Sequence, residues 1–293
     1  MSRSLEDSYR HCARVTRRCA QSFYWGLRLL PREKRRALYA IYAFLRGCDD
    51  SADEAAPDAR PGQLHRWRRA LDAALCGECA GDPCLPAFSD AVARYAIPGR
   101  YFHLLLDGAE MDLSVRRYPT FEALYDYCYR VASTVGLICL HVWGYEGEGA
   151  ELAAEECGIA FQLTNILRDI REDAARGRIY LPEEDLRRFN YGEREIAGQV
   201  RDARFAALMA FQVERARRYY RSVDRLLPCV SPDSRACLMA MAGVYEGLLD
   251  CMERSGFDVY SRRIALPKSH KIAIALRAWW RYRNGGETRP SQA

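Results

Sequence analysis

The amino-acid sequence predicts an all-α protein, and three observations support that fold class. Apolar residues recur with helical periodicity through most of the chain, and the strict alternation that is typical of strands is scarce. Stretches rich in glycine and proline divide the chain into segments of helical length. Hydrophobic residues make up 49% of the 293 positions, which is enough apolar material for one large core. We therefore predict a single-domain helical bundle.

The first predicted helix begins at Pro31, because proline suits the first turn of a helix. The helix runs into an acidic cluster and ends before a loop at 55–62. Four of its apolar residues recur at i, i+3, i+4 and i+7, the spacing of one helix face. These residues are Leu38, Ile41, Tyr42 and Leu45.

The remaining predicted helices follow from the positions of helix-breaking residues. Thr120 marks one start, because a threonine side chain can cap the first turn. Residues 176–193 are predicted to be a lid-like loop with a short helix inside it. One domain is predicted over 1–283, followed by a disordered tail at 284–293. Helices are predicted over about 63–75, 87–96, 99–113, 120–143, 150–174, 194–227 and 232–255.

Charge and composition exclude several functional classes. The 44 Lys and Arg residues exceed the 39 Asp and Glu residues by five, and the excess is too scattered to predict nucleic-acid binding. The first residues lack the apolar core of a signal peptide, and the longest apolar run is shorter than a membrane span. The 12 cysteines are therefore predicted to be reduced thiols without a zinc site. We expect a soluble cytoplasmic protein with an open oligomeric state, for which a monomer is compatible. Trp279 and Trp280 are candidates for peripheral membrane contact, but the favoured interpretation is that they pack the last helix against the body of the protein.

Three aspartates lie at the end of the first predicted helix. Asp49 and Asp53 are four residues apart and share the face that carries the apolar stripe. Carboxylates at the C-terminal end of a helix oppose the helix dipole, so three together favour a bound cation. The alternative is a frayed, solvated last turn. Asp50 points about 100° away from Asp49 and is the weaker candidate.

A second polar row lies about 120 residues further along the chain. Asn165, Asp169 and Asp173 are spaced at i, i+4 and i+8, and Gln162 lies near the same face. This row lies next to the apolar face of its helix and not on the opposite side. The alternative is an ordinary surface row that pairs with neighbouring arginines.

Together, the two acidic clusters predict a magnesium site. Magnesium prefers oxygen ligands and commonly combines one or two carboxylates with substrate phosphates. Two facing helices with carboxylates at i and i+4 can hold two or three such ions, which neutralise a leaving diphosphate. The carbocation left behind needs a dry pocket with aromatic walls. The chain has 18 Tyr, 10 Phe and 5 Trp residues with which to line one.

Several linked motifs occur together along the chain. The most specific is QLTNILRDIREDAARGRIYLP at 162–182, since an acidic DDxxD motif alone also occurs in chain-elongating synthases and terpene cyclases. With the other motifs, it makes the chain resemble the squalene/phytoene synthase family over about residues 8–280. The resemblance implies an isoprenoid-synthase-type bundle around a central cavity. It also implies head-to-head (1′-1) condensation of two prenyl diphosphates through a cyclopropylcarbinyl diphosphate. The other motifs are SFY at 22–24, LPR at 30–32, YAIYAF at 39–44, GAEMD at 108–112, YCYRVA at 127–132 and VG at 135–136.

The resemblance implies a role for each matching residue. One departure is at Ala20 and Gln21, where some family members place a small polar residue and a lysine that contact diphosphate. The tyrosines have an alternative as plain core residues, and the C-terminal cations as solvated charges. The implied metal-binding residues are Asp49, Asp53, Asn165, Asp169 and Asp173; the implied diphosphate-binding residues are Arg46, Gln162, Asn165, Arg168, Arg263 and Lys271; the cavity tyrosines are Tyr42, Tyr127 and Tyr245; and Arg178 and Tyr180 belong to a loop that closes over the site.

The length of the prenyl chain decides the product. The sequences of the motifs favour two C15 farnesyl diphosphates as substrates. The product would then be presqualene diphosphate or a squalene-type compound, as in hopanoid biosynthesis. The alternative is a phytoene synthase that joins two C20 geranylgeranyl diphosphates for carotenoids. Less favoured alternatives are a terpene cyclase and a non-catalytic assembly factor of the same fold. No NADPH requirement is expected, because the chain lacks a glycine-rich nucleotide loop.

Overall fold

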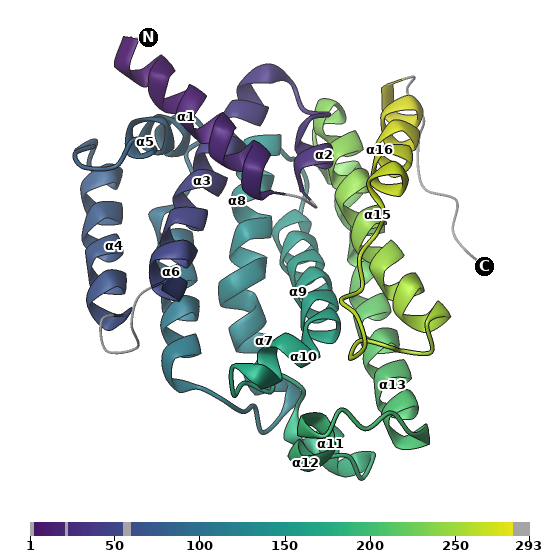
Figure 1. Ribbon diagram of the computed structural model, residues 1–293. Helices are drawn as coiled ribbons and strands as arrows, with labels where there is room; N and C mark the ends of the chain where they lie inside the picture. Colours follow the sequence, from purple (N-terminus) through teal and green to yellow (C-terminus); the bar gives the residue numbers. More distant parts are fainter. Residues whose placement is uncertain (1–2, 21–22, 55–59, 284–293) are drawn as a thin grey trace.

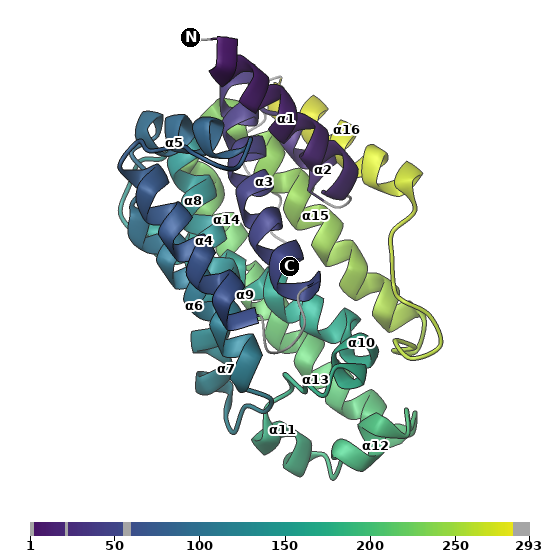
Figure 2. The same cartoon turned by 60° about the vertical axis from the view of Figure 1, so that its left-hand side comes forward.

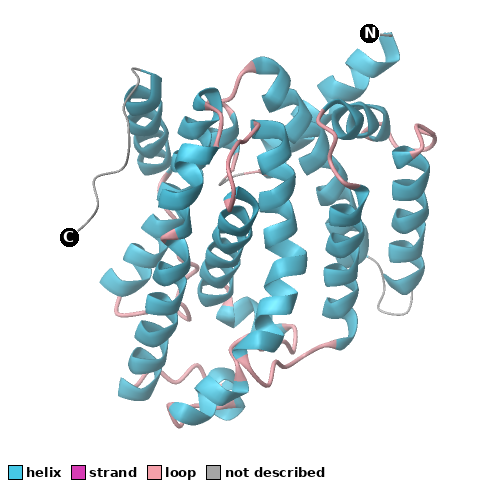
Figure 3. Ribbon diagram, turned by 180° about the vertical axis from the view of Figure 1, so that it is seen from behind, coloured by secondary structure: helices cyan, strands magenta, loops and turns pink. Residues whose placement is uncertain are grey.

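The computed structural model describes residues 3–20, 23–54 and 60–283. Within these ranges, the description leaves out the side chains of residues 3, 49–54, 60, 61 and 283. The described residues form helices and no strand, apart from one isolated bridge between Tyr145 and Val230 (Figure 3). The predicted all-α fold class is therefore confirmed.

Sixteen α-helices and one π-helix make up the described chain. In order they are α1 (Arg3–Cys19), α2 (Tyr24–Leu27), α3 (Arg32–Glu54), α4 (Arg60–Leu75), α5 (Leu85–Arg94), α6 (Gly99–Ser114), α7 (Phe121–Cys128), the π-helix η1 (Tyr129–Ser133), α8 (Thr134–Trp143), α9 (Ala150–Arg168), α10 (Ile170–Ala175), α11 (Glu183–Arg188), α12 (Glu193–Ala197), α13 (Ala203–Tyr220), α14 (Ser222–Cys229), α15 (Pro232–Arg254) and α16 (Lys268–Arg283).

Helix α9 occupies the centre of the bundle. It packs against η1, α8, α13, α14 and α15, so most of its surface is covered by other helices. Figure 1 shows α4 at one side and α15 and α16 at the other, with α8 and α9 between them. The short helices α10, α11 and α12 gather at one end of the molecule (Figures 1 and 2). Residues on α9 are thus well placed to face an interior space.

Aromatic packing fixes the position of α3 against its neighbours. Phe44 on α3 stacks on Phe88 of α5 with ring centroids 4.1 Å apart, and Phe88 meets Phe102 of α6 at 4.9 Å. All three side chains are fully buried. Truncation of such a residue to alanine typically costs about 3–5 kcal/mol. This cluster therefore anchors the helix that leads into the first acidic cluster.

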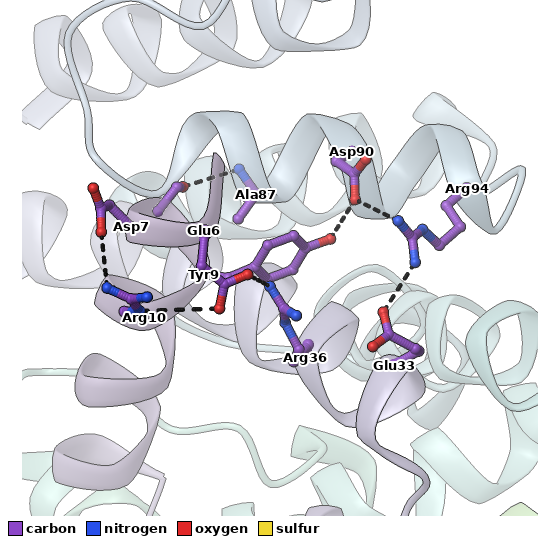
Figure 4. A network of polar contacts seen from close by, with 10 residues as sticks. Glu6, Asp7, Tyr9, Arg10, Glu33, Arg36, Ala87, Asp90 and Arg94 are labelled. Atoms are coloured by element: carbon purple, nitrogen blue, oxygen red, sulfur yellow. Dashed lines mark hydrogen bonds and ion pairs between the residues drawn. The ribbon is translucent and has the colours of Figure 1, made fainter. Parts of the chain in front are cut away.

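A polar network ties α1 to the same part of the bundle (Figure 4). The Tyr9 hydroxyl donates to Asp90 of α5 at 2.5 Å, and the Arg36 guanidinium of α3 lies 4.3 Å from the Tyr9 ring centroid. Arg36 also pairs with Glu6 at 2.6 Å, and Arg94 lies 3.4 Å from Asp90. Each of the carboxylates Glu6, Glu33 and Asp90 in this network pairs with an arginine, so their negative charges are compensated.

Several predicted helices are correct in position but differ in detail. Thr120 caps α7 as predicted, because its hydroxyl accepts from the Ala123 N–H at 3.3 Å. The predicted helix at 120–143 contains a π-helical turn, which the periodicity of apolar residues does not reveal. The predicted helix at 194–227 is wrong as a single element. It divides into three, because the Asp202 side chain accepts backbone N–H groups and begins α13.

Within the residues that the structure describes, no helix combines the length and the apolar character that crossing a bilayer requires.

Candidate active site

A cavity of about 840 Å³ lies between the helices around α9. Helices α3, α8, α9 and α15 each contribute to its wall, together with η1, the end of α1 and one residue of α14. Its lining residues are Arg18, Cys19, Ala20, Phe23, Tyr42, Leu45, Arg46, Val131, Ala132, Val135, Gly136, Cys139, Trp143, Ala154, Cys157, Gly158, Phe161, Gln162, Asn165, Arg168, Leu226, Leu238, Met241, Tyr245 and Arg263.

The cavity changes from apolar to polar along α9. Its α9 lining begins at Ala154 and stays apolar as far as Phe161, and then continues with Gln162, Asn165 and Arg168. At 1.5 Å per residue, the distance from Ala154 to Arg168 is about 21 Å. The site therefore has a long apolar part and one polar end, as an amphipathic substrate with a charged head requires.

Backbone contact between α9 and the opposite wall depends on two glycines. A Cβ atom at Gly158 would lie 2.5 Å from Ser133 Cα, and one at Gly136 would lie 2.8 Å from the Ala154 carbonyl oxygen. Both distances are shorter than a real Cβ contact, so only glycine permits this approach. The Ser133 hydroxyl also donates to the Glu155 carbonyl at 2.7 Å. The π-helix η1 is thus pressed directly against α9, and this part of the cavity wall is rigid.

Three aromatic rings gather where the cavity changes polarity. Phe161 and Tyr245 stack with centroids 4.5 Å apart and planes 5° apart, and Phe23 lies 5.5 Å from Tyr245. All three line the cavity. Burial raises the pKa of Tyr245 to about 12, so its hydroxyl stays protonated at neutral pH. Such rings can stabilise a cation without quenching it.

Asp169 lies between two arginines near the polar end. Arg168 and Arg263 each donate two hydrogen bonds to its carboxylate, and those from Arg263 measure 2.9 and 3.1 Å. Burial alone would raise the pKa of Asp169, but the two guanidinium groups outweigh burial and hold that pKa below its usual value. Asp169 is therefore a carboxylate throughout the neutral range.

Asp173 has the opposite electrostatic environment. Burial, together with the charges of Asp169 and Asp112, raises its pKa from 3.8 to about 7. The backbone keeps the i+4 pattern across the junction of α9 and α10, since Asp173 N–H donates to the Asp169 carbonyl at 2.9 Å. The predicted helix at 150–174 is thus interrupted at Asp169, but the spacing that places the two aspartates together survives.

Asp112 of α6 gathers three predicted site residues around its carboxylate. The Tyr127 hydroxyl donates to it at 3.1 Å and the Tyr180 hydroxyl at 2.7 Å, while Arg178 lies 3.7 Å away. The two hydroxyl oxygens are 3.3 Å apart. Burial is the largest cause of the raised pKa of both tyrosines. Both therefore act as neutral hydrogen-bond donors to a carboxylate.

The predicted lid-like loop is fixed to the body of the protein in this structure. Ile179 N–H donates to the Arg116 carbonyl at 3.0 Å, and Glu183 N–H donates to the Tyr118 carbonyl at 2.8 Å. These backbone bonds place Tyr180, which is buried, beside the Asp112 carboxylate. The short helix expected within 176–193 is present as α11.

The structure brings most of the predicted residues to one region. Tyr127 is not among the residues that line the cavity, and its hydroxyl donates to Asp112 instead. Lys271 is also absent from the lining, although it is close enough to Arg168 for that charge to help burial lower its pKa. The side chains of Asp49 and Asp53 lie outside the described residues. The predicted residues that line the cavity are Tyr42, Arg46, Gln162, Asn165, Arg168, Tyr245 and Arg263.

The donor chemistry of the described site fits a divalent cation. Asn165 Oδ1 is buried and has no hydrogen-bond partner among the described residues, although Asn165 lines the cavity. Asp173 is crowded by two other carboxylates, and a cation would relieve that repulsion. In the described part of the chain, no three His, Cys, Asp or Glu side chains are arranged so that they could hold a metal ion by themselves. A site for several ions would therefore also draw on the first acidic cluster.

Three residues of the candidate site were not predicted as site residues from the sequence. Phe23 and Phe161 were not singled out, because an aromatic residue on an apolar face cannot be distinguished from core packing. Asp112 was noted only within a motif. Its spacing of 15 residues from Tyr127 carries no periodic signal, and its helix holds other charged residues, so nothing in the sequence separates it from them.

Comparisons with known proteins identify the family of the chain. The family model described as squalene/phytoene synthase matches residues 16–270. The 15-cis-phytoene synthase of Synechococcus elongatus is 40% identical over 282 residues, which cover 92% of this chain and 91% of the relative. The phytoene synthase of Mycobacterium tuberculosis is 41% identical over 278 residues, which cover 94% and 91%.

Solved structures show the same architecture. A dehydrosqualene synthase crystallised with a ligand superposes with a TM-score of 0.88 at 26% identity, covering 96% of this chain and 98% of that one. A squalene synthase from Alicyclobacillus acidocaldarius gives a TM-score of 0.81 at 29% identity, covering 88% and 97%. With a family match across most of its length and relatives above 30% identity, this chain belongs to the squalene/phytoene synthase family of prenyltransferases.

Proposed function

We propose that this prenyltransferase joins two geranylgeranyl diphosphates head to head and forms phytoene. The observation that carries the proposal is the cavity with one polar end, which suits a long hydrocarbon with a diphosphate head. The relatives at 40–41% identity are phytoene synthases, so they favour the C20 alternative over the C15 substrate first expected from the sequence. The C15 reading is therefore the less well supported of the two.

The polar end supplies positive charge for the two diphosphates. Arg46, Arg168 and Arg263 line it, and Lys271 lies near Arg168. Guanidinium groups bind phosphate oxygens through paired hydrogen bonds, so they suit a diphosphate head. On binding, Arg168 and Arg263 would exchange Asp169 for diphosphate oxygens and leave that carboxylate free for other partners.

Asp169, Asp173 and Asn165, together with Asp49 and Asp53, would hold magnesium at this end. When bound, the ions stabilise the negative charge of the departing diphosphate. The aromatic rings of Phe23, Phe161 and Tyr245 would then face the allylic cation and exclude water from it.

The overall reaction balances without a reductant. Two C20 allylic diphosphates lose two diphosphate groups and two protons as one carbon–carbon bond and one new double bond form in the C40 product. The first proton leaves as the cyclopropane ring of the intermediate closes, and the second leaves as the final cation is quenched. Tyr127 and Tyr180 would hold Asp112 and Arg178 in place beside Asp173, which is a positioning role.

The direct test is product analysis with each substrate separately. Purified protein is incubated with geranylgeranyl diphosphate or farnesyl diphosphate and magnesium, and the lipids are identified by chromatography and mass spectrometry. We expect a C40 product from the first substrate and little or no C30 product from the second. Chelation of magnesium should abolish both. A C30 product alone would overturn the substrate assignment, and inactivity with both substrates would overturn the enzyme assignment.

A second candidate is formation of a C30 product from two farnesyl diphosphates. It is favoured by the structural neighbours, which are a dehydrosqualene synthase and a squalene synthase at 26% and 29% identity. The same experiment separates the two candidates, because the products differ by ten carbon atoms.

A further inference from the structure

The outer face of α16 carries large apolar side chains that are exposed. Trp280 is 70% exposed and Leu276 is 57% exposed, and these two residues lie four positions apart on one face. Trp279, beside them, is 38% exposed. Three of the five residues with exposed large apolar side chains in the described chain belong to this helix, and they form the largest such group.

The orientation of α16 is fixed by its inner face. Ala275 and Ala278 are buried against Ala240 of α15, and Ile274 packs close to Gly243. Figure 1 shows α16 lying alongside α15 at the edge of the bundle. Rotation of the helix would separate these small residues and open the contact. Leu276 and Trp280 therefore face outward as a consequence of packing.

The charge of α16 is entirely positive. Its 16 residues include basic side chains at both ends and no Asp or Glu. In the described part of the chain, no carboxylate lies within ion-pair distance of Lys268 or Arg277, both of which are exposed. This differs from α1, α3 and α5, where Arg36 and Arg94 pair with carboxylates.

We propose that the outer face of α16 seats this protein on an anionic membrane surface. Tryptophan and leucine favour the boundary between headgroups and acyl chains, and lysine and arginine beside them attract anionic lipids. A second copy fits less well, because a two-fold contact through this face would place the same basic residues opposite one another. The apolar centre of the face matches the acyl-chain boundary of a membrane, and its basic flanks match anionic headgroups.

The position of this face suits a lipid substrate, a point that rests on the proposed function. α16 packs on α2 and α15, and α15 supplies Met241 and Tyr245 to the cavity wall. Lys271, on the inner side of the same helix, lies near Arg168 at the polar end. A membrane beneath α16 would therefore lie one helix away from the cavity that receives the prenyl chain.

The test measures binding of the full chain to vesicles without any substrate, so its result is independent of the proposed function. We expect flotation with vesicles of phosphatidylcholine and phosphatidylglycerol, and little with phosphatidylcholine alone. The double variant Leu276→Gln/Trp280→Gln should lower the partition coefficient at least about tenfold. The matched control is Leu152→Gln, which removes a leucine that is 53% exposed on α9, and it should bind as the wild type does.

The contribution of positive charge to vesicle binding is tested with a second variant and its own control. Lys268→Gln/Arg277→Gln should weaken binding by about fivefold per charge, and added salt should reduce the wild-type binding in the same direction. Arg187→Gln removes an exposed arginine from α11 and should have no effect.

Three outcomes would overturn the proposal. The first is equal binding of the wild type to neutral and anionic vesicles, or none to either. The second is an equal loss of binding in the Leu152→Gln control. The third is a change from dimer to monomer in the double variant by light scattering, which would assign this face to a second copy. Retained product formation on detergent-dispersed substrate, with vesicle binding lost, would support the proposal and show that the variant is folded.

Discussion

Two buried tyrosines in this protein each donate to an aspartate, but the surroundings of the two pairs differ. Tyr9 donates to Asp90, and a guanidinium lies against each partner: Arg36 over the ring and Arg94 beside the carboxylate. Tyr127 donates to Asp112, and Arg178 lies 3.7 Å from that carboxylate. The first pair joins α1 to α5, and the second lies beside the polar end of the cavity.

The difference lies in how negative charge is balanced. In the network of Figure 4, Glu6, Glu33 and Asp90 each pair with an arginine, so the network stabilises the fold without needing a ligand. Near the cavity, Asp112 and Asp169 also have arginine partners, but burial, followed by the charges of these two carboxylates, still raises the pKa of Asp173 to about 7. A carboxyl group with its pKa raised in this way is typical of functional sites.

Asp173→Asn should produce the largest effect in this comparison. We expect product formation to fall by about 100- to 1,000-fold or more, because a ligand for the divalent ions is lost. Rate measurements at saturating substrate and magnesium would check this. Activity within a few-fold of the wild type would contradict a role of Asp173 in the site.

The same variant should gain stability in the absence of metal. The raised pKa of Asp173 means that the folded state holds its proton more tightly than the unfolded state, so stability falls as pH rises from about 4 to 7. The variant lacks this loss. At pH 8 with a chelator, its free energy of unfolding should exceed that of the wild type by roughly 2 kcal/mol, allowing for partial exposure. The difference should disappear near pH 4, as measured by denaturant titration.

Tyr127→Phe and Tyr9→Phe remove the same hydroxyl from the two pairs. Tyr127→Phe should lower the rate about 10- to 100-fold, because Asp112 loses a donor that helps position Arg178 and Tyr180. Tyr9→Phe should leave the rate unchanged. Steady-state kinetics on both proteins would test this, and equal rates in the two variants would remove the functional distinction between the pairs.

Tyr9→Phe should instead affect stability. Loss of the 2.5 Å hydrogen bond to Asp90 should cost about 1.5 kcal/mol in the free energy of unfolding. Chemical denaturation would measure the loss. No change in unfolding would indicate that Arg94 and Glu33 hold α5 without the tyrosine.

Arg94→Gln and Arg263→Gln should have the smallest effects. Both arginines pair with a carboxylate while partly exposed, at 42% and 58%, so each change should cost about 1 kcal/mol or less of stability. Only Arg263→Gln should raise KM, by up to about tenfold, since one charge-assisted contact to diphosphate is lost. A raised KM in Arg94→Gln would contradict the proposal that only the second region binds substrate.

Local sequence signals predicted the local features of the fold. Pro31 indicated the start of α3, Thr120 the cap of α7, and the i, i+4 spacing the proximity of Asp169 and Asp173. Each depends on neighbours within one or two helical turns. The sequence did not predict α1, whose buried face carries Ser8, Cys12 and Thr16 at four-residue spacing. Because these residues are small and mostly polar, they do not form a recognisable apolar stripe in the sequence, although their side chains are buried.

Contacts between distant segments could not be predicted. Asp112 and Tyr180 are 68 residues apart and meet only because backbone bonds fix the segment after α10 to the segment before α7. The π-helix likewise depends on the close approach of Gly158 from another helix. The family resemblance supplied candidates for the site, but the grouping around Asp112 required the three-dimensional structure.

The backbone contact at Gly136 and Gly158 has a consequence for how this enzyme can acquire new substrates. Where two main chains touch, no side chain remains to be shortened, so this wall cannot recede to admit a longer hydrocarbon. On the facing walls, by contrast, Leu238 and Met241 of α15 and Leu226 of α14 are side chains that can change size. Substrate-length specificity would therefore change through these facing residues, while the glycine contact keeps the opposite wall of the cavity in place.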